Sequence, residues 1–326
     1  MPDSPRTTDA VQTPAALVDV DRMHANLRRA AEYCRAHGLA WRPHAKTHKS
    51  PALAAEQVRA GAVGVTVATP REAEVMAGAA GDLLLAYPPI GRAKLDRLMA
   101  LPEQVRLTVG LDSAEALRGL AEAEGVEYRG LMFYPGHVRE RVEEQDAALR
   151  TLSDRLGRTL EALHAAGVAP GTVSGGSTPT FWRSHEIAGI TEVRPGTNIF
   201  NDRTTAEIGA CGWDECAYSV LATVVSTSVP GQAVVDAGSK ALSREEIRAD
   251  APGYGALLDR PEVVVKGVSE EHGLLDLSRT DWRPRIGERV RIVPNHVCVS
   301  VNLQERLYAV RGGDVVDVWD VAARGR

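Results

Sequence analysis

The chain has 326 residues, of which 44% are hydrophobic and 25% are charged. This balance is typical of a globular protein with a full-sized core, and it excludes a disordered, collagen-like or disulfide-stapled chain. The 38 basic and 43 acidic residues give a net charge of −5, so we expect neither nucleic acid nor a membrane as a partner. The N-terminus lacks the apolar segment of a signal peptide, and no run of about 18 apolar residues occurs. We therefore expect a cytoplasmic protein with reduced thiols.

Short apolar runs alternate with amphipathic runs along the first half of the sequence. After an opening strand at residues 16–20, Asp21 can cap a helix that runs to His37. Thr69 and Glu72 form a capping-box pattern at the start of a later helix. The strands expected after the first helix comprise residues 40–42, 64–68, 82–87, 106–111 and 128–133, and the helices that follow them comprise residues 51–60, 70–80, 92–100, 113–125 and 145–166. So many βα units, with no Gly-x-Gly-x-x-Gly motif after the first strand, favour a (β/α)8 TIM-type barrel over a dinucleotide-binding sheet.

The pattern changes in the last third of the sequence. The βα signal is weaker between residues 172 and 208, and after about Ala210 only β-rich runs follow, with no comparable helices between them. These runs comprise residues 218–228, 233–239, 263–269, 289–302 and 307–319. We therefore predict an α/β barrel at residues 21–210 and a C-terminal all-β domain at residues 211–326, to which a strand at residues 12–20 also belongs.

Lysine is scarce, so lysine chemistry is easy to locate. The chain has 38 basic residues, of which the lysines are Lys46, Lys49, Lys94, Lys240 and Lys266. Lys46 follows the first predicted barrel strand, and active sites of such barrels collect at the carboxyl ends of the strands. A lysine in that position can form a Schiff base with an aldehyde. The alternative interpretation is a solvated basic loop.

Two glycine-rich turns are expected at the ends of late barrel strands. They are the segments at residues 174–178 (SGGST) and 194–198 (RPGTN). Backbone N–H groups and hydroxyls in such turns can bind phosphate, although most turns of this kind are only turns. Together with a Schiff-base lysine, they suggest pyridoxal phosphate as a cofactor.

Three further groups of side chains are candidates for chemistry. On a strand, His296 and Cys298 would project from one face and could bind zinc, whereas the alternative is a core cysteine beside a surface histidine. Tyr134 and His137 follow the predicted strand at 128–133 and could line the barrel mouth. The polar segments at residues 236–240 and 269–273 and the pair Cys211 and Cys216 are more typical of turns and structural cysteines.

Motifs along almost the whole chain resemble the D-threonine aldolase and D-serine dehydratase family. They keep the family's order and comprise Thr13-Pro14, RPHAKTHKS (42–50), GAVGVTVATPREAEVM (61–76), GGSTPT (175–180), RPGTN (194–198), DAGSKALS (236–243), SEEHG (269–273) and PNHVC (294–298). Members of this family are fold-type III pyridoxal-phosphate enzymes, similar to alanine racemase in having an α/β barrel followed by a β domain.

The resemblance assigns roles to individual residues. It implies that Lys46 carries the pyridoxal phosphate and that His296 and Cys298 bind Zn²⁺, or Mn²⁺ or another divalent metal. It implies that the remaining cofactor contacts come from Tyr134, Thr178, Gly196, Thr197 and Asn198. It also implies a homodimer.

The resemblance further implies a lyase acting on a D-3-hydroxy amino acid whose β-hydroxyl binds the metal. In a dehydratase, Lys46 removes the α-proton and hydroxide leaves, giving a 2-oxo acid and ammonia. In an aldolase, a base such as His137 deprotonates the hydroxyl and the Cα–Cβ bond breaks, giving glycine and an aldehyde. Dehydratases of the family tend to have His-x-Cys where aldolases have His-x-Asp, so Cys298 favours a dehydratase of D-serine or D-threo-3-hydroxyaspartate. An amino-acid racemase and a non-catalytic pyridoxal-phosphate carrier are further alternatives.

Overall fold

The chain forms two units, whose boundaries fall within the first helix, within the RPGTN segment and after Val321. A computed structural model describes residues 5–113, 126–247 and 251–325, so the helix expected at residues 113–125 lies almost wholly outside the described part. The β unit comprises residues 1–26 and 197–321, and the α/β unit comprises residues 27–196 and 322–326. The second boundary therefore precedes the expected one at 210. The reason is that Thr204 donates from both N and Oγ1 to the carbonyl of Asn295, at 3.2 and 2.6 Å, which ties residues after 197 to the β unit.

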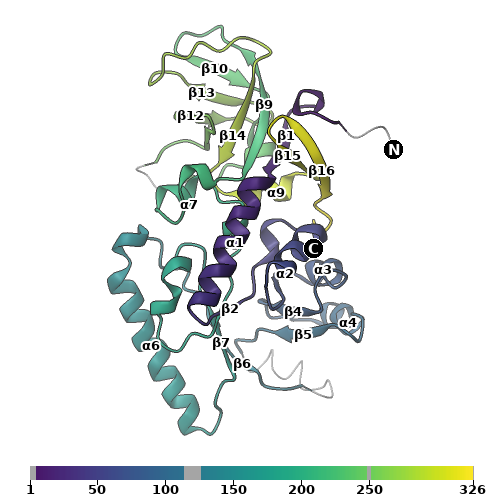
Figure 1. The fold of residues 1–326 in the computed structure, drawn as a ribbon, viewed down its shortest axis with the longest axis vertical. Coiled ribbons are helices and arrows are strands. Elements are labelled where there is room, and N and C mark those ends of the chain that lie inside the picture. Colours follow the sequence, from purple (N-terminus) through teal and green to yellow (C-terminus); the bar gives the residue numbers. More distant parts are fainter. Residues whose placement is uncertain (1–4, 114–125, 248–250, 326) are drawn as a thin grey trace. The chain divides into compact units, whose positions relative to one another are not determined.

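The β unit is built on one nine-stranded sheet (Figure 1). Its strands are β1 (Ala15–Asp19), β9 (Tyr218–Ser226), β10 (Gln232–Val235), β11 (Gly255–Leu257), β12 (Arg260–Val268), β13 (Gly273–Asp276), β14 (Arg289–Pro294), β15 (Arg306–Arg311) and β16 (Asp314–Asp320). Strand β9 pairs with β14, β1 and β10, and the pairing with β10 closes six of the strands into a ring. The expectation that the N-terminal strand belongs with the C-terminal strands is confirmed, because β1 lies between β9 and β15.

Short helices interrupt the β unit. They are α7 (Arg203–Glu207), α8 (Ser239–Leu242) and α9 (Val297–Leu303), with 3-10 turns at Thr8–Ala10, Thr197–Ile199 and Trp213–Glu215. The expected strand at residues 289–302 is wrong in its second half, because β14 ends at Pro294 and α9 begins at Val297. Val297, Ser300 and Val301 are the buried residues of α9, and their spacing is that of one helix face.

The α/β unit contains parallel strands in two sheets. Their orders are β2-β8-β7-β6 and β3-β4-β5, and a single parallel bridge between His44 and Thr66 joins the sheets. The strands are β2 (Ala40–Trp41), β3 (Val65–Val67), β4 (Asp82–Leu85), β5 (Arg106–Val109), β6 (Gly130–Met132), β7 (Thr172–Gly175) and β8 (Glu192–Val193). In the described residues β5 and β6 do not pair, so the parallel βα units are present while closure into an eight-stranded barrel stays a prediction.

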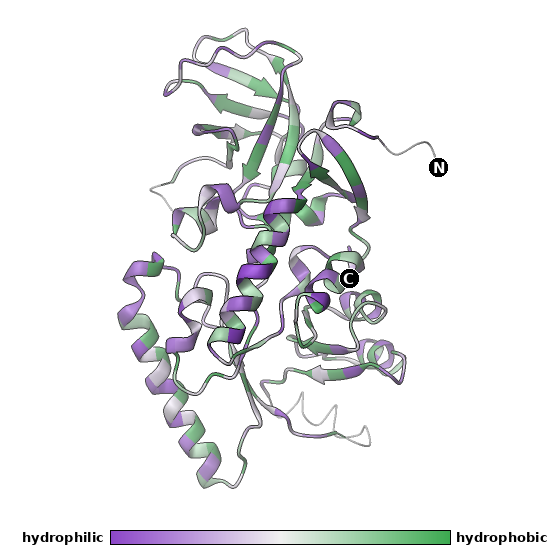
Figure 2. Cartoon of the chain, in the orientation of Figure 1, coloured by the Kyte–Doolittle hydropathy of each residue, from purple (hydrophilic) through white to green (hydrophobic). Residues whose placement is uncertain are grey.

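Helices follow most of these strands, as the sequence predicts. They are α2 (Pro51–Arg59), α3 (Pro70–Met76), α4 (Arg92–Met99) and α6 (Asp146–Ala165), with 3-10 turns at Ala45–Thr47, Val142–Glu144 and Phe181–Glu186. Helix α1 (Val20–Ala36) follows β1 and precedes β2. Helices α2, α3 and α4 lie side by side (Figure 1). Polar and apolar residues alternate along α6 (Figure 2), whose buried residues Leu149, Leu152 and Leu156 mark one face.

The helix starts show which capping residues the sequence identifies correctly. Thr69 Oγ1 accepts from Glu72 N at 3.1 Å, as the capping pattern predicts. The cap of α1 differs from the prediction, because Asp19, not Asp21, accepts from the N–H groups of residues 21 and 22 at 3.1 and 3.0 Å. In the part of the chain that the structure describes, no helix is both long and apolar enough to cross a bilayer.

The core of the α/β unit includes the C-terminal segment. Val65, Leu83 and Leu85 from the strands pack with Met76 of α3 and with Ala323. Ala323 N donates to the carbonyl of Lys49 at 3.0 Å. The last residues of the chain thus pack against the segment that contains Lys46.

Candidate functional site

Lys46 lies where the sequence places it, directly after a buried parallel strand. Strand β2 ends at Trp41, and Lys46 is the central residue of the 3-10 turn that leads into α2. The bridge between His44 and Thr66 fixes the start of this turn. The Lys46 side chain is exposed, so its amine is accessible to a ligand.

The charges near Lys46 are mostly positive. Burial lowers the pKa of His44 well below its usual value, and the charges of Lys46, Arg194 and His48 add to this effect. Burial lowers the pKa of Arg194 to about 10. Arg194 donates to Ser174 Oγ at 2.5 Å and to a backbone carbonyl at 2.7 Å. A cluster of this kind favours an anionic ligand beside Lys46.

The buried carboxylate of Glu72, near Lys46, forms an ion pair with Lys49. Glu72 Oε1 lies 3.6 Å from Lys49 Nζ, and Glu72 Oε2 accepts from Ala68 N at 2.7 Å. Burial raises the pKa of Glu72, and the hydrogen bond from Ala68 and the charges of Lys49 and Lys46 oppose this shift. Among the described residues Lys46 itself forms no ion pair, so of these two lysines Lys46 is the one left for chemistry.

Gly196 and Thr178 lie beside the lysine turn. Gly196 N donates to Thr178 Oγ1 at 3.3 Å. A Cβ atom at position 196 would lie 2.8 Å from Thr47 Oγ1 and 3.0 Å from both Cβ and the carbonyl oxygen of His44. Only glycine fits there without a shift of its neighbours. We call Lys46, His44, Thr47, Thr178 and Gly196 the lysine cluster.

The next two residues of the RPGTN segment belong to the β unit. Thr197 and Asn198 are buried in the 3-10 turn Thr197–Ile199. The Oδ1 atom of Asn198 is buried without a hydrogen-bond partner, which is the state of a side chain that a bound ligand would satisfy. Thr197 Oγ1 lies 3.8 Å from Cys298 Sγ.

His296 and Cys298 are brought together, although not in the way the sequence suggests. His296 caps α9 and Cys298 lies in its first turn, so the two side chains do not share the face of a strand. They are nevertheless neighbours, because Cys298 is one of the groups that raise the pKa of His296. Asp202 Oδ2, fully buried, accepts from His296 Nδ1 at 3.2 Å and from Val297 N at 3.0 Å. Although burial opposes it, these hydrogen bonds raise the pKa of His296 to about 11.

Tyr134 and His137 lie after β6, on the surface of the α/β unit. Tyr134 is 70% exposed, and its ring packs where a Cβ atom of Gly136 would be. His137 is exposed as well. In the described part of the chain, no hydrogen bond joins either residue to the lysine cluster, so their proposed roles depend on the resemblance alone.

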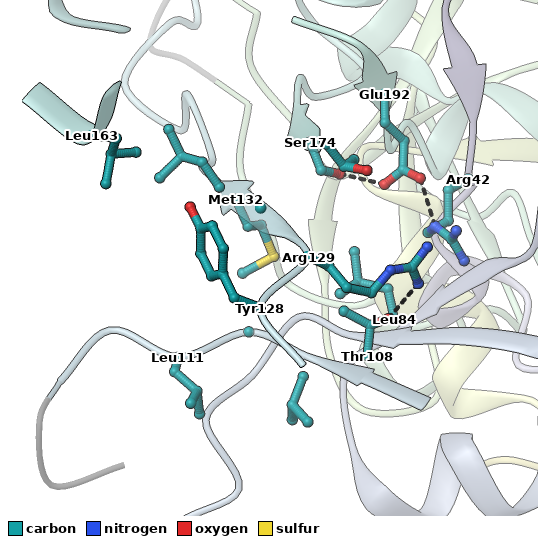
Figure 3. Close-up of a pocket in the computed structure, with 15 residues that line it drawn as sticks. Arg42, Leu84, Thr108, Leu111, Tyr128, Arg129, Met132, Leu163, Ser174 and Glu192 are labelled. Carbon is teal, nitrogen blue, oxygen red and sulfur yellow. Dashed lines mark hydrogen bonds and ion pairs between the residues drawn. The ribbon is translucent and has the colours of Figure 1, made fainter. Parts of the chain in front are cut away.

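A separate cavity of about 310 Å³ is lined by residues of β5 and β6 (Figure 3). Its charged wall is internally paired: Arg42 Nε lies 2.8 Å from Glu192 Oε2, and Ser174 Oγ donates to Glu192 Oε1 at 2.5 Å. Arg129 donates to Thr108 Oγ1 at 2.7 Å. None of the predicted site residues lines this cavity, so we keep the candidate site at the lysine cluster and at His296.

The residues present fit both groups that the resemblance implies. Gly196 and Thr178 offer a glycine cradle and a hydroxyl next to Lys46. Imidazole and thiolate are ligands that zinc prefers. Among the described residues, no group of three or more His, Cys, Asp or Glu side chains is placed to hold a metal.

The structure adds two residues that the sequence analysis does not single out. Asp202 orients His296, and Thr47 packs against Gly196. A signal for Asp202 exists in the sequence, because Asp202 and Thr205 have the spacing of a helix capping box, which the structure contains. No sequence signal connects that cap with His296, which is 94 residues away.

Comparisons with known proteins agree with this architecture. The family model for a serine dehydratase domain matches residues 217–310. The D-threo-3-hydroxyaspartate dehydratase of Delftia sp. (strain HT23) is 34% identical, over 95% of this chain and 97% of its own length. The D-threonine aldolase of Filomicrobium marinum is 31% identical, with a TM-score of 0.89 over 100% of this chain and 99% of that chain.

The wider fold relationship is to alanine racemase. The alanine racemase of Bacillus anthracis shares 16% identity with a TM-score of 0.63, over 95% of this chain and 98% of that chain, which shows a common fold. The architecture is therefore that of the alanine racemase-like enzymes. Among enzymes of this architecture, the 34% identity to the dehydratase, over nearly its full length, shows the family of this chain. The chain belongs to the D-threonine aldolase and D-serine dehydratase family.

Proposed function

We propose that this protein is a pyridoxal-phosphate- and divalent-metal-dependent lyase that dehydrates a D-3-hydroxy amino acid to a 2-oxo acid and ammonia. The observation that carries the proposal is the placement of His296 and Cys298 at the start of α9, where Asp202 Oδ2 lies 3.2 Å from His296 Nδ1. A neighbouring nitrogen and sulfur ligand are suited to zinc. The dehydratase from Delftia, at 34% identity, supports the same reaction class.

Lys46 holds the cofactor and moves a proton. When bound, pyridoxal phosphate supplies an aldehyde for the substrate amine and a ring that accepts the electron pair of the α-carbon, while zinc supplies a Lewis acid for the β-hydroxyl. Lys46 Nζ is the group that would hold the aldehyde carbon of the cofactor. The same Nζ would take the proton from the α-carbon of the substrate.

The other residues bind and orient. Gly196, Thr178, Thr197 and Asn198 are the residues that would hold the phosphate. The low pKa of His44 keeps that imidazole neutral beside Lys46 and Arg194. His296 faces Asp202 through Nδ1, which leaves Nε2 for the metal. Cys298 is the second ligand, and Tyr134 contacts the cofactor.

The second candidate function is an aldolase on the same scaffold. It is favoured by the 31% identity and TM-score of 0.89 to the D-threonine aldolase of Filomicrobium marinum. In that reaction His137 removes the proton of the β-hydroxyl. The substrate side chain is a matter of pocket shape, because one methylene changes binding by only about 1–3 kcal/mol.

Borohydride labelling tests the cofactor assignment. Wild type, Lys46→Ala and the control Lys94→Ala, which removes an exposed lysine of α4, are incubated with pyridoxal phosphate, dialysed, scanned for a violet absorption band and then reduced. We expect the band and a pyridoxyl group on Lys46 in wild type and control, and neither in Lys46→Ala. A band that survives in Lys46→Ala, or a label on another lysine, would contradict the proposal.

A further inference from the structure

Two of the four cysteines lie together in the β unit. Cys211 follows α7, and Cys216 follows the 3-10 turn Trp213–Glu215 and precedes β9. Both are free thiols; Cys216 is buried and Cys211 is partly exposed. An oxidant can therefore reach Cys211 but not Cys216 directly.

Side-chain contacts hold the two thiols next to each other. Of the groups around Cys216, the neighbouring Cys211 thiol contributes most to raising its pKa. Cys211 Sγ donates to Thr205 Oγ1 at 3.5 Å, and Cys216 Sγ donates to the carbonyl of Asp202 at 3.8 Å. Both cysteines pack in the apolar cluster that contains Val293.

The backbone between the cysteines is fixed as well. Gly212 N donates to Glu215 Oε2 at 2.6 Å, and Cys216 N donates to the carbonyl of Trp213 at 3.2 Å. The indole of Trp213 donates to the carbonyl of Leu258 at 2.9 Å, which anchors the turn to the rest of the unit. The turn that connects the two cysteines is thus fixed by hydrogen bonds, and both thiols pack at the same apolar cluster.

We propose that Cys211 and Cys216 are a redox modification site. Low-molecular-weight disulfides such as glutathione disulfide oxidise the two thiols to a reversible disulfide between Cys211 and Cys216. The proposal is independent of the lyase activity. The net change is balanced: both thiols lose their protons and one electron each, one S–S bond forms in the protein, and one glutathione disulfide becomes two glutathione molecules.

Exposure sets the order of the two exchange steps. The Cys211 thiolate attacks glutathione disulfide, which forms a mixed disulfide and releases one glutathione thiolate. Cys216 then attacks Cys211 Sγ and releases the second. The neighbouring Cys211 thiol, and then burial, raise the pKa of Cys216. The first of these causes is lost once Cys211 is modified.

The disulfide would act on the residue that orients His296. Oxidation removes the Cys216 S–H donor from the Asp202 carbonyl, and the carboxylate of Asp202 receives the hydrogen bonds of His296 and Val297. The modification site and the candidate metal pair thus share Asp202.

Peptide mapping of the full chain, loaded with pyridoxal phosphate and zinc and then treated with glutathione disulfide, tests the proposal directly. Trypsin releases both cysteines on the single peptide of residues 204–240, whereas Cys34, buried and on the peptide of residues 30–35, is the control. We expect the 204–240 peptide to lose two hydrogen atoms in mass and to resist alkylation after denaturation, and reduction to restore both properties. A 204–240 peptide that alkylates at both cysteines after treatment, as Cys34 does, would overturn the proposal.

Two variants test the order of the steps. Cys216→Ser lacks the resolving thiol, so we expect a glutathione adduct to accumulate on Cys211. Cys211→Ser leaves only the buried thiol, so we expect no adduct on Cys216. An unmodified Cys211 in a folded Cys216→Ser variant would overturn the attack by Cys211, and the wild-type map decides disulfide formation even if that variant does not fold.

Discussion

Gly196 is the residue at which backbone geometry and proposed chemistry are most closely linked. Its N–H is directed to Thr178 Oγ1, and its missing side chain leaves room for Thr47 and His44. The sequence motif predicts that a glycine is needed in this turn, but only the structure shows which atoms require it.

Replacing Gly196 by alanine therefore tests the cradle. The added Cβ would lie 2.8 Å from Thr47 Oγ1, and overpacking of this kind costs about 1–3 kcal/mol. We expect the affinity for pyridoxal phosphate, measured by absorbance titration, to fall about tenfold or more. Gly78→Ala is the matched control, because nothing lies within 4 Å of its added Cβ. Equal affinities for the two variants would show that Gly196 does not shape the cofactor site.

Asp202 is the residue whose role the sequence hides most completely. Its carboxylate caps α7 through Thr205 N at 2.9 Å and also receives His296 Nδ1. Carboxylates that orient a metal-binding histidine contribute about tenfold to 100-fold to metal affinity.

We accordingly expect Asp202→Asn to weaken zinc binding by about tenfold to 100-fold, because the amide can keep the cap but no longer accepts from His296 with a charged oxygen. Competition with a chelator measures the affinity, and the exposed Asp214→Asn serves as control. Pyridoxal phosphate binding should be unchanged in both. If zinc affinity is the same in both variants, Asp202 does not position His296.

At the scale of elements, α9 is a case in which an alternating sequence pattern predicts a strand but the structure contains a helix. The segment VCVSVNL alternates β-branched and polar residues, which is typical of a strand. In the structure Val297 and Val301 are buried, whereas Val299 is 38% exposed, so the burial follows a helical period. Buried Ser300 donates to the carbonyl of Ala241 at 2.7 Å, a long-range contact that favours the helix and that the sequence cannot reveal.

The start of α3, unlike α9, is predicted correctly by the local sequence, and its cap can be tested. Thr69→Ala removes the acceptor for Glu72 N, and loss of such a cap costs about 1 kcal/mol. Urea unfolding should show this decrease in the free energy of unfolding. Thr151→Ala, in the exposed middle of α6, should leave stability unchanged or slightly higher because alanine is the better helix former. A Thr69→Ala protein as stable as the Thr151→Ala protein would contradict the assigned cap.

The junction between the lysine turn and α2 predicts a pH dependence. His48 is fully buried, accepts from Ser50 N at Nδ1 and faces Gln57 Oε1 at Nε2. Burial lowers its pKa from 6.5 to about 4. Between those values the unfolded chain binds a proton and the folded chain does not, so stability decreases as the pH falls through this range.

His48 should contribute about 3 kcal/mol to this loss by pH 4. Urea unfolding of wild type and His48→Gln between pH 7 and pH 4 measures the contribution as a difference in slope. We expect the variant to lose less stability than wild type over this range. Parallel curves would mean that His48 takes up its proton equally well in the folded chain.

At the scale of the whole molecule, the sequence predicts features that depend on local patterns. It does not predict contacts between segments that are distant in the sequence. The βα alternation, Lys46 at a strand end and the membership of β1 in the β unit follow from period and motif. The return of Ala323 to Lys49 depends on long-range packing, and so does the change of unit at Thr197. The expectation that His296 and Cys298 share one face of a strand is wrong, because both residues lie at the start of α9, and their role as metal ligands stays a prediction.

Product analysis with D-threonine tests the proposed function most directly, because this substrate offers both lyase reactions in one tube. The protein, loaded with pyridoxal phosphate and zinc, is incubated with D-threonine, and the products are identified by mass spectrometry. We predict 2-oxobutanoate and ammonia in equal amounts. Glycine and acetaldehyde would contradict the dehydratase assignment and establish the aldolase.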